Sequence, residues 1–194
     1  MSRDIRLATE SDAASIAAIY APYVESDVIS FEYEAPTPME IAARIKAITV
    51  QWPWLVLTDE GEIAGYAYAG RHHERAAYGW SVNVSVYVSP RFHRRGVGRS
   101  LYSALFAVLK WQGYYKAYAG ITMPNPASVA IHESFGFKRI GIYHGVGYKN
   151  GAWRDVAWYE GEVQPERPEP LPPRPVSAAV GSPIWDQLLS SALQ

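Results

Sequence analysis

The feature that most constrains the fold is an alternating strand followed closely by a glycine-containing loop and a long amphipathic helix. Valines occupy every second position from Val82 to Val88, which predicts a strand over about residues 78–88 that stops at Ser89-Pro90. A helix with one apolar face is predicted over residues 100–112, with Gly113 just beyond its end. A strand that leads into a helix in this way indicates a helix packed against a sheet.

The loop between them, Arg94-Arg95-Gly96-Val97-Gly98-Arg99, has the composition of an anion site. A diphosphate needs several converging backbone N–H groups, and a glycine-containing turn that enters a helix supplies them together with the positive end of the helix. Tight strand-to-helix turns also use glycine for steric reasons alone. The spacing matches neither Gly-x4-Gly-Lys-Ser/Thr nor Gly-x-Gly-x-x-Gly, so those two classes of nucleotide site are excluded.

The remaining pattern predicts an α+β chain. A helix is expected after Thr9, a second one at Pro38 with Thr37 as its N-cap, and a short one at Pro126 with Asn125 as its N-cap. The element order is β-α-α-β-β-β-α-β-α-β-β, which favours one mixed sheet flanked by helices. The other strands are expected over about residues 5–8, 54–57, 63–69, 115–122, 139–148 and 156–162.

The composition changes at Gln164. We expect one domain over residues 1–163 and a proline-rich, extended tail over residues 164–194 that ends in a short possible helix. Two interpretations of this end are open: a frayed terminus, or a helix that docks on its own body or on a second subunit. The apolar residues with helical spacing are Ile184, Trp185, Leu188, Leu189 and Leu193.

Charge and composition exclude several classes of function. The 18 Lys and Arg against 19 Asp and Glu, without a run of five like charges, argue against nucleic acid or anionic lipid as a partner. The absence of cysteine excludes thiolate nucleophiles and Cys-type zinc sites, and the histidines show no ligand spacing, so no metal is expected. Without a signal-like start or a long apolar run, we expect a cytoplasmic protein.

Several motifs together resemble one family. The loop is similar to the Gln/Arg-x-x-Gly-x-Gly/Ala signature of the GNAT superfamily of N-acetyltransferases, and residues 5–162 resemble its phosphinothricin and methionine sulfoximine/sulfone branch. The resemblance implies the GNAT acyl-CoA acyltransferase fold, with a mixed, mostly antiparallel sheet splayed at an acetyl-CoA site, and a homodimer. The motifs are Pro53-Trp54-Leu55-Val56, Ala67-Tyr68-Ala69-Gly70, Val86-Tyr87-Val88-Ser89-Pro90, Pro124-Asn125, His132-Glu133, Gly136-Phe137 and Gly147-Tyr148-Lys149-x-Gly151-x-Trp153-x-Asp155.

The same resemblance implies cofactor-binding residues. The loop from Arg94 to Arg99 would hold the pyrophosphate of acetyl-CoA. Val86, Tyr87 and Val88 would offer their backbone to the pantetheine arm, like an additional strand. Asn125 would also face the cofactor, although helix N-capping alone explains an Asn-Pro pair.

For the chemistry, the resemblance implies direct attack of an amine on the thioester. His132 stands where many members place a tyrosine that acts as general acid; the alternative is an ordinary buried histidine. Asn83 stands where the branch carries a glutamate, the natural general base. An amide cannot accept the proton. Three alternatives are open. The proton leaves through ordered water, another group such as His132 or Glu32 assists, or activity on the usual substrates is weak.

Phe31, Glu32 and Arg75 are the candidates for the acceptor site; alternatively, Phe31 belongs to the core and the two charged residues are solvated. His72-His73 replaces an aromatic and a basic residue that are usual in the branch, and His93 replaces the usual first residue of the signature. Three functions are open: acetylation of a small amino-acid-like acceptor, acetylation of another small amine or a protein N-terminus, and CoA binding without catalysis.

Overall fold

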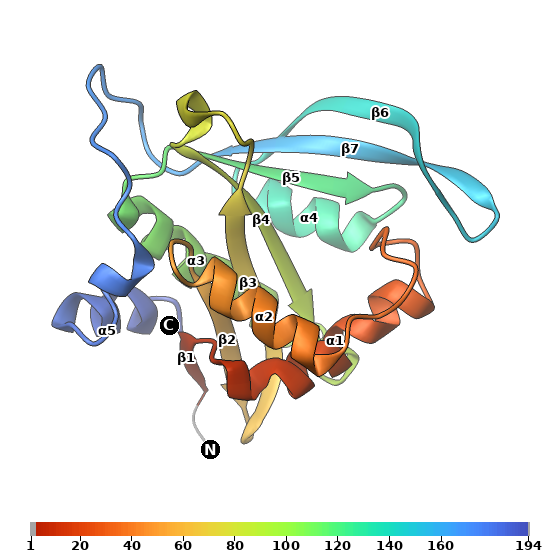
Figure 1. Cartoon of the computed structure of the whole chain (residues 1–194), viewed down its shortest axis with the longest axis horizontal. Coiled ribbons are helices and arrows are strands. Elements are labelled where there is room, and N and C mark those ends of the chain that lie inside the picture. Colours follow the sequence, from red (N-terminus) through yellow and green to blue (C-terminus); the bar gives the residue numbers. More distant parts are fainter. Residues whose placement is uncertain (1–2, 194) are drawn as a thin grey trace.

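One seven-stranded sheet organises the computed structural model, which describes residues 3–193 (Figure 1). The strand order is β1-β2-β3-β4-β5-β7-β6, and every neighbouring pair is antiparallel except β4 and β5. The mixed, mostly antiparallel sheet that the sequence predicts is thus confirmed. The strands are β1 (Asp4–Leu7), β2 (Trp54–Asp59), β3 (Glu62–Arg71), β4 (Ser81–Val88), β5 (Lys116–Thr122), β6 (Lys138–Lys149) and β7 (Ala152–Glu162).

Helices cover both faces of the sheet. On one face, two helices enclose a core that contains Ile16, Ile41 and Tyr66, and on the other a larger core contains Leu101 and Leu105. The predicted order of the principal strands and helices up to residue 162 is confirmed. The helices are α1 (Ala13–Glu25) and α2 (Pro38–Ile48) on the first face, and α3 (Val97–Gln112), α4 (Pro126–Ser134) and α5 (Pro183–Ser190) on the second.

The helix starts follow from local chemistry. The Thr37 side chain accepts a hydrogen bond from the Glu40 N–H, and the Asn125 side chain accepts one from the Ser128 N–H, as the two predicted N-caps require. Helix α3 begins at Val97, three residues before the predicted start, because Gly96 ends the loop with a left-handed φ of 80°. This geometry points the first N–H groups of α3 toward the end of β4.

The sheet divides between β4 and β5. These strands pair only through Ser81–Lys116, Val82–Ala117 and Asn83–Tyr118, after which they diverge. Beyond that point, β4 continues with β3 and β5 continues with β7. Residues 84–88 of β4 and 119–122 of β5 therefore do not pair with each other, and the predicted splay of the sheet is present.

The segment after residue 163 packs on the body of the same chain. The Arg174 N–H donates to the Gln112 carbonyl at 2.8 Å. The side chains of Val176, Trp185 and Leu189 are buried in the core beside α3. Of the two interpretations of this end, docking on its own body is the one observed. No helix within residues 3–193 is long and apolar enough to cross a membrane.

Candidate functional site

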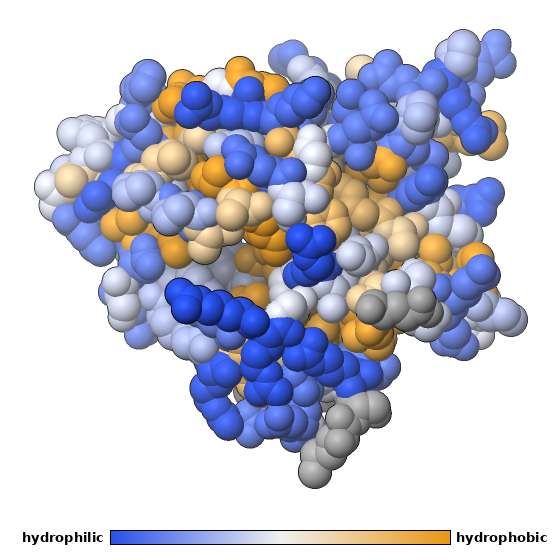
Figure 2. All heavy atoms as spheres, turned by 180° about the vertical axis from the view of Figure 1, so that it is seen from behind, coloured by the Kyte–Doolittle hydropathy of each residue, from blue (hydrophilic) through white to orange (hydrophobic). Residues whose placement is uncertain are grey.

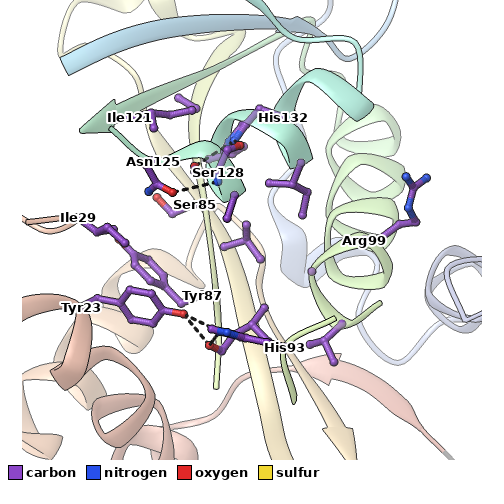
Figure 3. Close-up of a pocket in the computed structure, with 18 of the residues that line it drawn as sticks. Tyr23, Ile29, Ser85, Tyr87, His93, Arg99, Ile121, Asn125, Ser128 and His132 are labelled. Carbon is purple, nitrogen blue, oxygen red and sulfur yellow. Dashed lines mark hydrogen bonds between the residues drawn. The ribbon is translucent and has the colours of Figure 1, made fainter. Parts of the chain in front are cut away.

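A cavity of about 590 Å³ occupies the gap where β4 and β5 diverge (Figure 3). Its walls are residues 84–88 of β4, residues 119–122 of β5, the loop before α3 and the inner side of α4. Tyr23 of α1 and Ile29 of the following loop close one side. Figure 2 shows the molecule from behind, with a hollow bordered by hydrophobic atoms and strongly hydrophilic atoms below it.

The loop before α3 forms one end of this cavity. Arg94, Gly96, Gly98 and Arg99 line it, and no acidic side chain lies in the first turn of α3 to cancel the positive end of the helix. A Cβ at Gly98 would lie 2.9 Å from the Ile131 Cδ1 atom, so a side chain there would have to displace the end of Ile131. Unopposed N–H groups, a helix N-terminus and two arginines suit a bound diphosphate.

Arg95 differs from its neighbours in the loop. Its guanidinium lies 2.8 Å from the Glu60 carboxylate, 3.2 Å from Asp59 and 5.0 Å from the centre of the Phe92 ring. It does not line the cavity. The side chain of Arg95 therefore ties the loop to the β2–β3 turn instead of pointing at an anion.

The backbone of β4 presents alternate residues to the cavity. The Ser89 N–H donates to the Ala64 carbonyl of β3 at 2.9 Å, so by the alternation of an antiparallel ladder the Tyr87 backbone also pairs with β3. The backbone N–H and carbonyl of Val86 therefore point away from β3, toward the gap. The Val88 carbonyl is engaged there, because it accepts the Tyr23 hydroxyl at 2.6 Å. Of the three residues predicted to offer their backbone, only Val86 is free to do so with both groups.

His132 lines the cavity from α4 with only 4% of its surface exposed (Figure 3). Its Nδ1 lies 2.7 Å from the Ser128 carbonyl, which can only accept, so Nδ1 carries the proton. Its Nε2 then accepts the Tyr102 hydroxyl at 2.8 Å. Burial lowers the pKa of His132 and keeps the ring neutral. Asn125 lines the cavity beside it while capping α4.

Asn83 is the β4 member of the last residue pair before the strands diverge. It is not part of the cavity wall. Its Oδ1 lies 2.9 Å from the Nδ1 of His72, and the His72 ring stacks on Tyr118 with centroids 4.1 Å apart. Two of the residues that depart from the family pattern, Asn83 and His72, are therefore in direct contact.

The predicted acceptor residues lie on two loops outside the cavity. The Phe31 ring packs so closely on Gly147 of β6 that a Cβ there would overlap it. Arg44 holds the Glu32 carboxylate through two bonds of 2.8 and 2.9 Å and lowers the pKa of Glu32. Arg75 is exposed and precedes the 3-10 turn Ala76–Tyr78. The structure does not bring these three side chains to one point.

Lys149 is a site-building residue that the sequence reasoning missed. Its ammonium is buried and donates to the carbonyls of Val24 and Ser30, both at 2.6 Å, and of Glu32 at 2.9 Å. Burial lowers the pKa of Lys149. These bonds fix the loop between α1 and α2 against β6. The only sequence signal is its place in the Gly147-Tyr148-Lys149 motif, which carries no role by itself.

The part of the chain that the structure describes contains no group of three or more metal-ligating side chains.

Comparison with known proteins places this arrangement in a family. Residues 5–158 match the acetyltransferase (GNAT) domain model. Phosphinothricin N-acetyltransferase of Streptomyces viridochromogenes is 39% identical over 89% of this chain and 92% of that protein. L-methionine sulfoximine/L-methionine sulfone acetyltransferase of Salmonella typhimurium is 31% identical over 80% of this chain and 92% of that protein. The crystal structure of a phosphinothricin acetyltransferase from Sinorhizobium meliloti in complex with AcCoA is 31% identical and matches with a TM-score of 0.81 over 91% of this chain and 99% of that one. The chain therefore belongs to the GNAT acetyltransferase family.

Proposed function

We propose that the protein transfers the acetyl group of acetyl-CoA to the amino group of a small amino-acid-like acceptor, of the phosphinothricin or methionine sulfoximine/sulfone type. The observation that carries this proposal is the cavity between β4 and β5, which joins an anion site to an unpaired strand edge. The relatives at 39% and 31% identity, which are named for such acceptors, support it.

The residues present fit acetyl-CoA. The pyrophosphate is held by the N-terminus of α3 with Arg94 and Arg99, and the open wall at Gly98 leaves room for the chain that follows. The pantetheine arm contains amides, which pair with the free backbone groups of Val86. The thioester then lies toward the closed end of the gap, near the Asn83–Tyr118 pair.

His132 remains the proposed group for returning a proton to the leaving sulfur. It lines the cavity, but both of its ring nitrogens are bonded, to Ser128 and Tyr102. Proton delivery requires one of these bonds to open. A His132→Gln variant should therefore lower kcat and leave the KM for acetyl-CoA unchanged. An unchanged kcat would leave His132 with only a packing role.

The acceptor approaches from the α1–α2 face, where Phe31 and Glu32 are proposed contacts, and Arg75 is a third proposed contact from the separate β3–β4 connection. Glu32 acts there as one partner of the Arg44 ion pair, so the two side chains together present a charged, hydrogen-bonding wall. Arg75 supplies an unshielded cation for an anionic acceptor group. Arg75→Ala should raise the KM for an anionic acceptor and not that for acetyl-CoA. Arg91→Ala, which removes an exposed arginine paired with Glu62, should change neither.

The proposal is tested by measuring thiol release from acetyl-CoA with a panel of amino acids, sulfoximines, sulfones and simple amines. Turnover with the amino-acid-like acceptors is expected. Turnover with simple amines alone would refute the proposed amino-acid-like acceptor and assign a simple amine in its place. Tight CoA binding without turnover on any acceptor would show a binding module in place of an enzyme.

We further propose that two copies assemble. The β6–β7 hairpin carries exposed large apolar side chains, which in a soluble protein mark an interaction surface. Light scattering should give the mass of a dimer, and a monomer mass at micromolar concentration would refute it. The exposed residues are Ile140, Tyr143, Val146, Tyr148 and Trp153.

A further inference from the structure

The reaction needs a proton acceptor on the side from which the amine arrives. An ammonium must lose a proton before its nitrogen can attack a thioester. At the closed end of the gap the β4 residue is Asn83, whose amide cannot take that proton. The contact that Asn83 makes with His72 supplies a different group.

The hydrogen bond between these residues fixes the state of the imidazole. Asn83 Oδ1 lies 2.9 Å from His72 Nδ1, and the Asn83 amide nitrogen points to the Arg71 carbonyl, at 3.5 Å. That orientation makes Oδ1 the acceptor and places the imidazole proton on Nδ1. In the neutral ring, the basic lone pair therefore resides on Nε2.

His72 shares an unbonded ring nitrogen with His93 and His144, but it is half-buried whereas those two side chains are exposed. Within residues 3–193, Nε2 of His72 has no hydrogen-bond partner in the protein, whereas both nitrogens of His132 are bonded. His93 uses only Nε2, toward the Val88 carbonyl and the Tyr23 hydroxyl, and His144 uses only Nδ1, toward Asp155. His72 is the half-buried histidine that combines an oriented ring with an uncommitted lone pair.

The His72 ring also lies where a base for the acceptor amine is needed. His72 stacks on Tyr118, the β5 residue that pairs with Asn83, at an interplanar angle of 14°. The imidazole therefore lies over the point where β4 and β5 begin to diverge. On the proposed function, this is the end of the gap that receives the thioester.

We propose that His72, oriented by Asn83, is the general base of the acetyl transfer. This inference rests on the proposed function. The acceptor ammonium gives one proton to His72 Nε2, and the freed nitrogen lone pair forms the N–C bond to the acetyl carbon. The C–S bond breaks with its electron pair on sulfur, which takes the second proton of the nitrogen by way of His132. The products are the amide and CoA thiol, and His72 returns its proton to solvent.

Three titratable side chains face His72. His73 and Tyr78 belong to the same β3–β4 connection, with ring centroids 4.2 and 6.0 Å away. Tyr118 of β5 is the third, and its hydroxyl donates to Glu160 of β7. Burial, together with Glu160, raises the pKa of Tyr118 to about 12, so its hydroxyl stays neutral in the neutral range. Glu160 is itself paired with Lys116.

The test compares His72→Ala and His72→Gln with His73→Ala, the matched control on the adjacent exposed histidine. Glutamine keeps a donor for Asn83 Oδ1 but has no basic nitrogen. Both His72 variants should lower kcat about 100-fold, the usual scale for a lost general base. The KM for acetyl-CoA and the affinity for CoA should not change. His73→Ala should retain the kcat of the unmodified protein.

The pH profile separates a base from a packing role. The fall in kcat at low pH is measured with two acceptors whose amines differ in pKa. If this fall occurs at the same pH with both acceptors, it belongs to a group of the enzyme, and it should disappear in His72→Gln. Adding Asn83→Glu to His72→Ala should restore kcat and move the limb to lower pH, because it supplies a carboxylate base. Retention of kcat and of the limb in both His72 variants would overturn the inference alone. Absence of turnover in the unmodified protein would overturn the proposed function as well.

Discussion

Lys149→Met tests whether one buried ammonium holds the loop between α1 and α2 in place. Methionine keeps the apolar length of the side chain but leaves the carbonyls of Val24, Ser30 and Glu32 without their donor. Each orphaned buried carbonyl costs about 1–3 kcal/mol, about 3–9 kcal/mol for the three. Removing the buried charge offsets several kcal/mol of desolvation. We therefore expect a net loss of about 2–4 kcal/mol in the free energy of unfolding.

Urea denaturation at neutral pH measures this loss, and hydrogen exchange shows where it occurs. The amides of residues 26–36 should exchange faster in Lys149→Met, because the loop loses its attachment to β6. Lys116→Met is the matched control, since its surface pairs with Glu160 and Glu166 at 3.6 and 3.5 Å contribute at most about 1 kcal/mol. Equal stability losses in the two variants, with no change in loop exchange, would refute the reasoning.

Two further perturbations address the cavity and the acid stability. Gly98→Val places side-chain atoms against Ile131 and should weaken CoA binding at least about 10-fold, or about 1.4 kcal/mol, by calorimetry; Gly141→Ala, where a Cβ meets nothing within 4 Å, should not. Arg6 binds Asp12 through two bonds of 2.7 Å and lowers the pKa of that carboxyl, so this stabilisation is complete above the ordinary aspartate pKa and is lost as pH falls through the lowered value. At pH 7, Arg6→Met should therefore have a free energy of unfolding about 2 kcal/mol lower than the unmodified protein, measured by urea denaturation. The difference should vanish once the pH is below the lowered pKa of Asp12, and a difference that persists there would contradict this assignment.

The elements that the sequence predicted well are those with strong local signals. Thr37 and Asn125 cap their helices because each side chain reaches an N–H three residues ahead. The predicted element boundaries differ from the observed ones where a short irregular turn precedes the element. Strand β4 starts at Ser81 and not near residue 78, because Ala76–Tyr78 forms a 3-10 turn.

The site was predictable only in outline, because its details depend on contacts between distant residues. The glycine loop and His132 are marked by motifs, but nothing in the loop itself shows that Arg95 turns to Asp59 and Glu60. The bond from Tyr23 to the Val88 carbonyl joins positions 65 residues apart. Sequence reasoning treated Asn83 and the histidine pair at 72–73 as separate departures, and only the three-dimensional structure makes them one unit.

The short junction between β4 and β5 also bears on how this chain folds. On its N-terminal side, β2, β3 and β4 are successive hairpins, and on its C-terminal side β6 and β7 form another. Contacts of this kind have small sequence separation and form quickly. The parallel junction, in contrast, brings together residues more than thirty positions apart across the whole of α3, and it consists of only three residue pairs. The β1–β2 and β5–β7 pairs are similarly nonlocal, so all three pairings close after the hairpins, and closure of the junction completes the cleft between the two halves of the sheet.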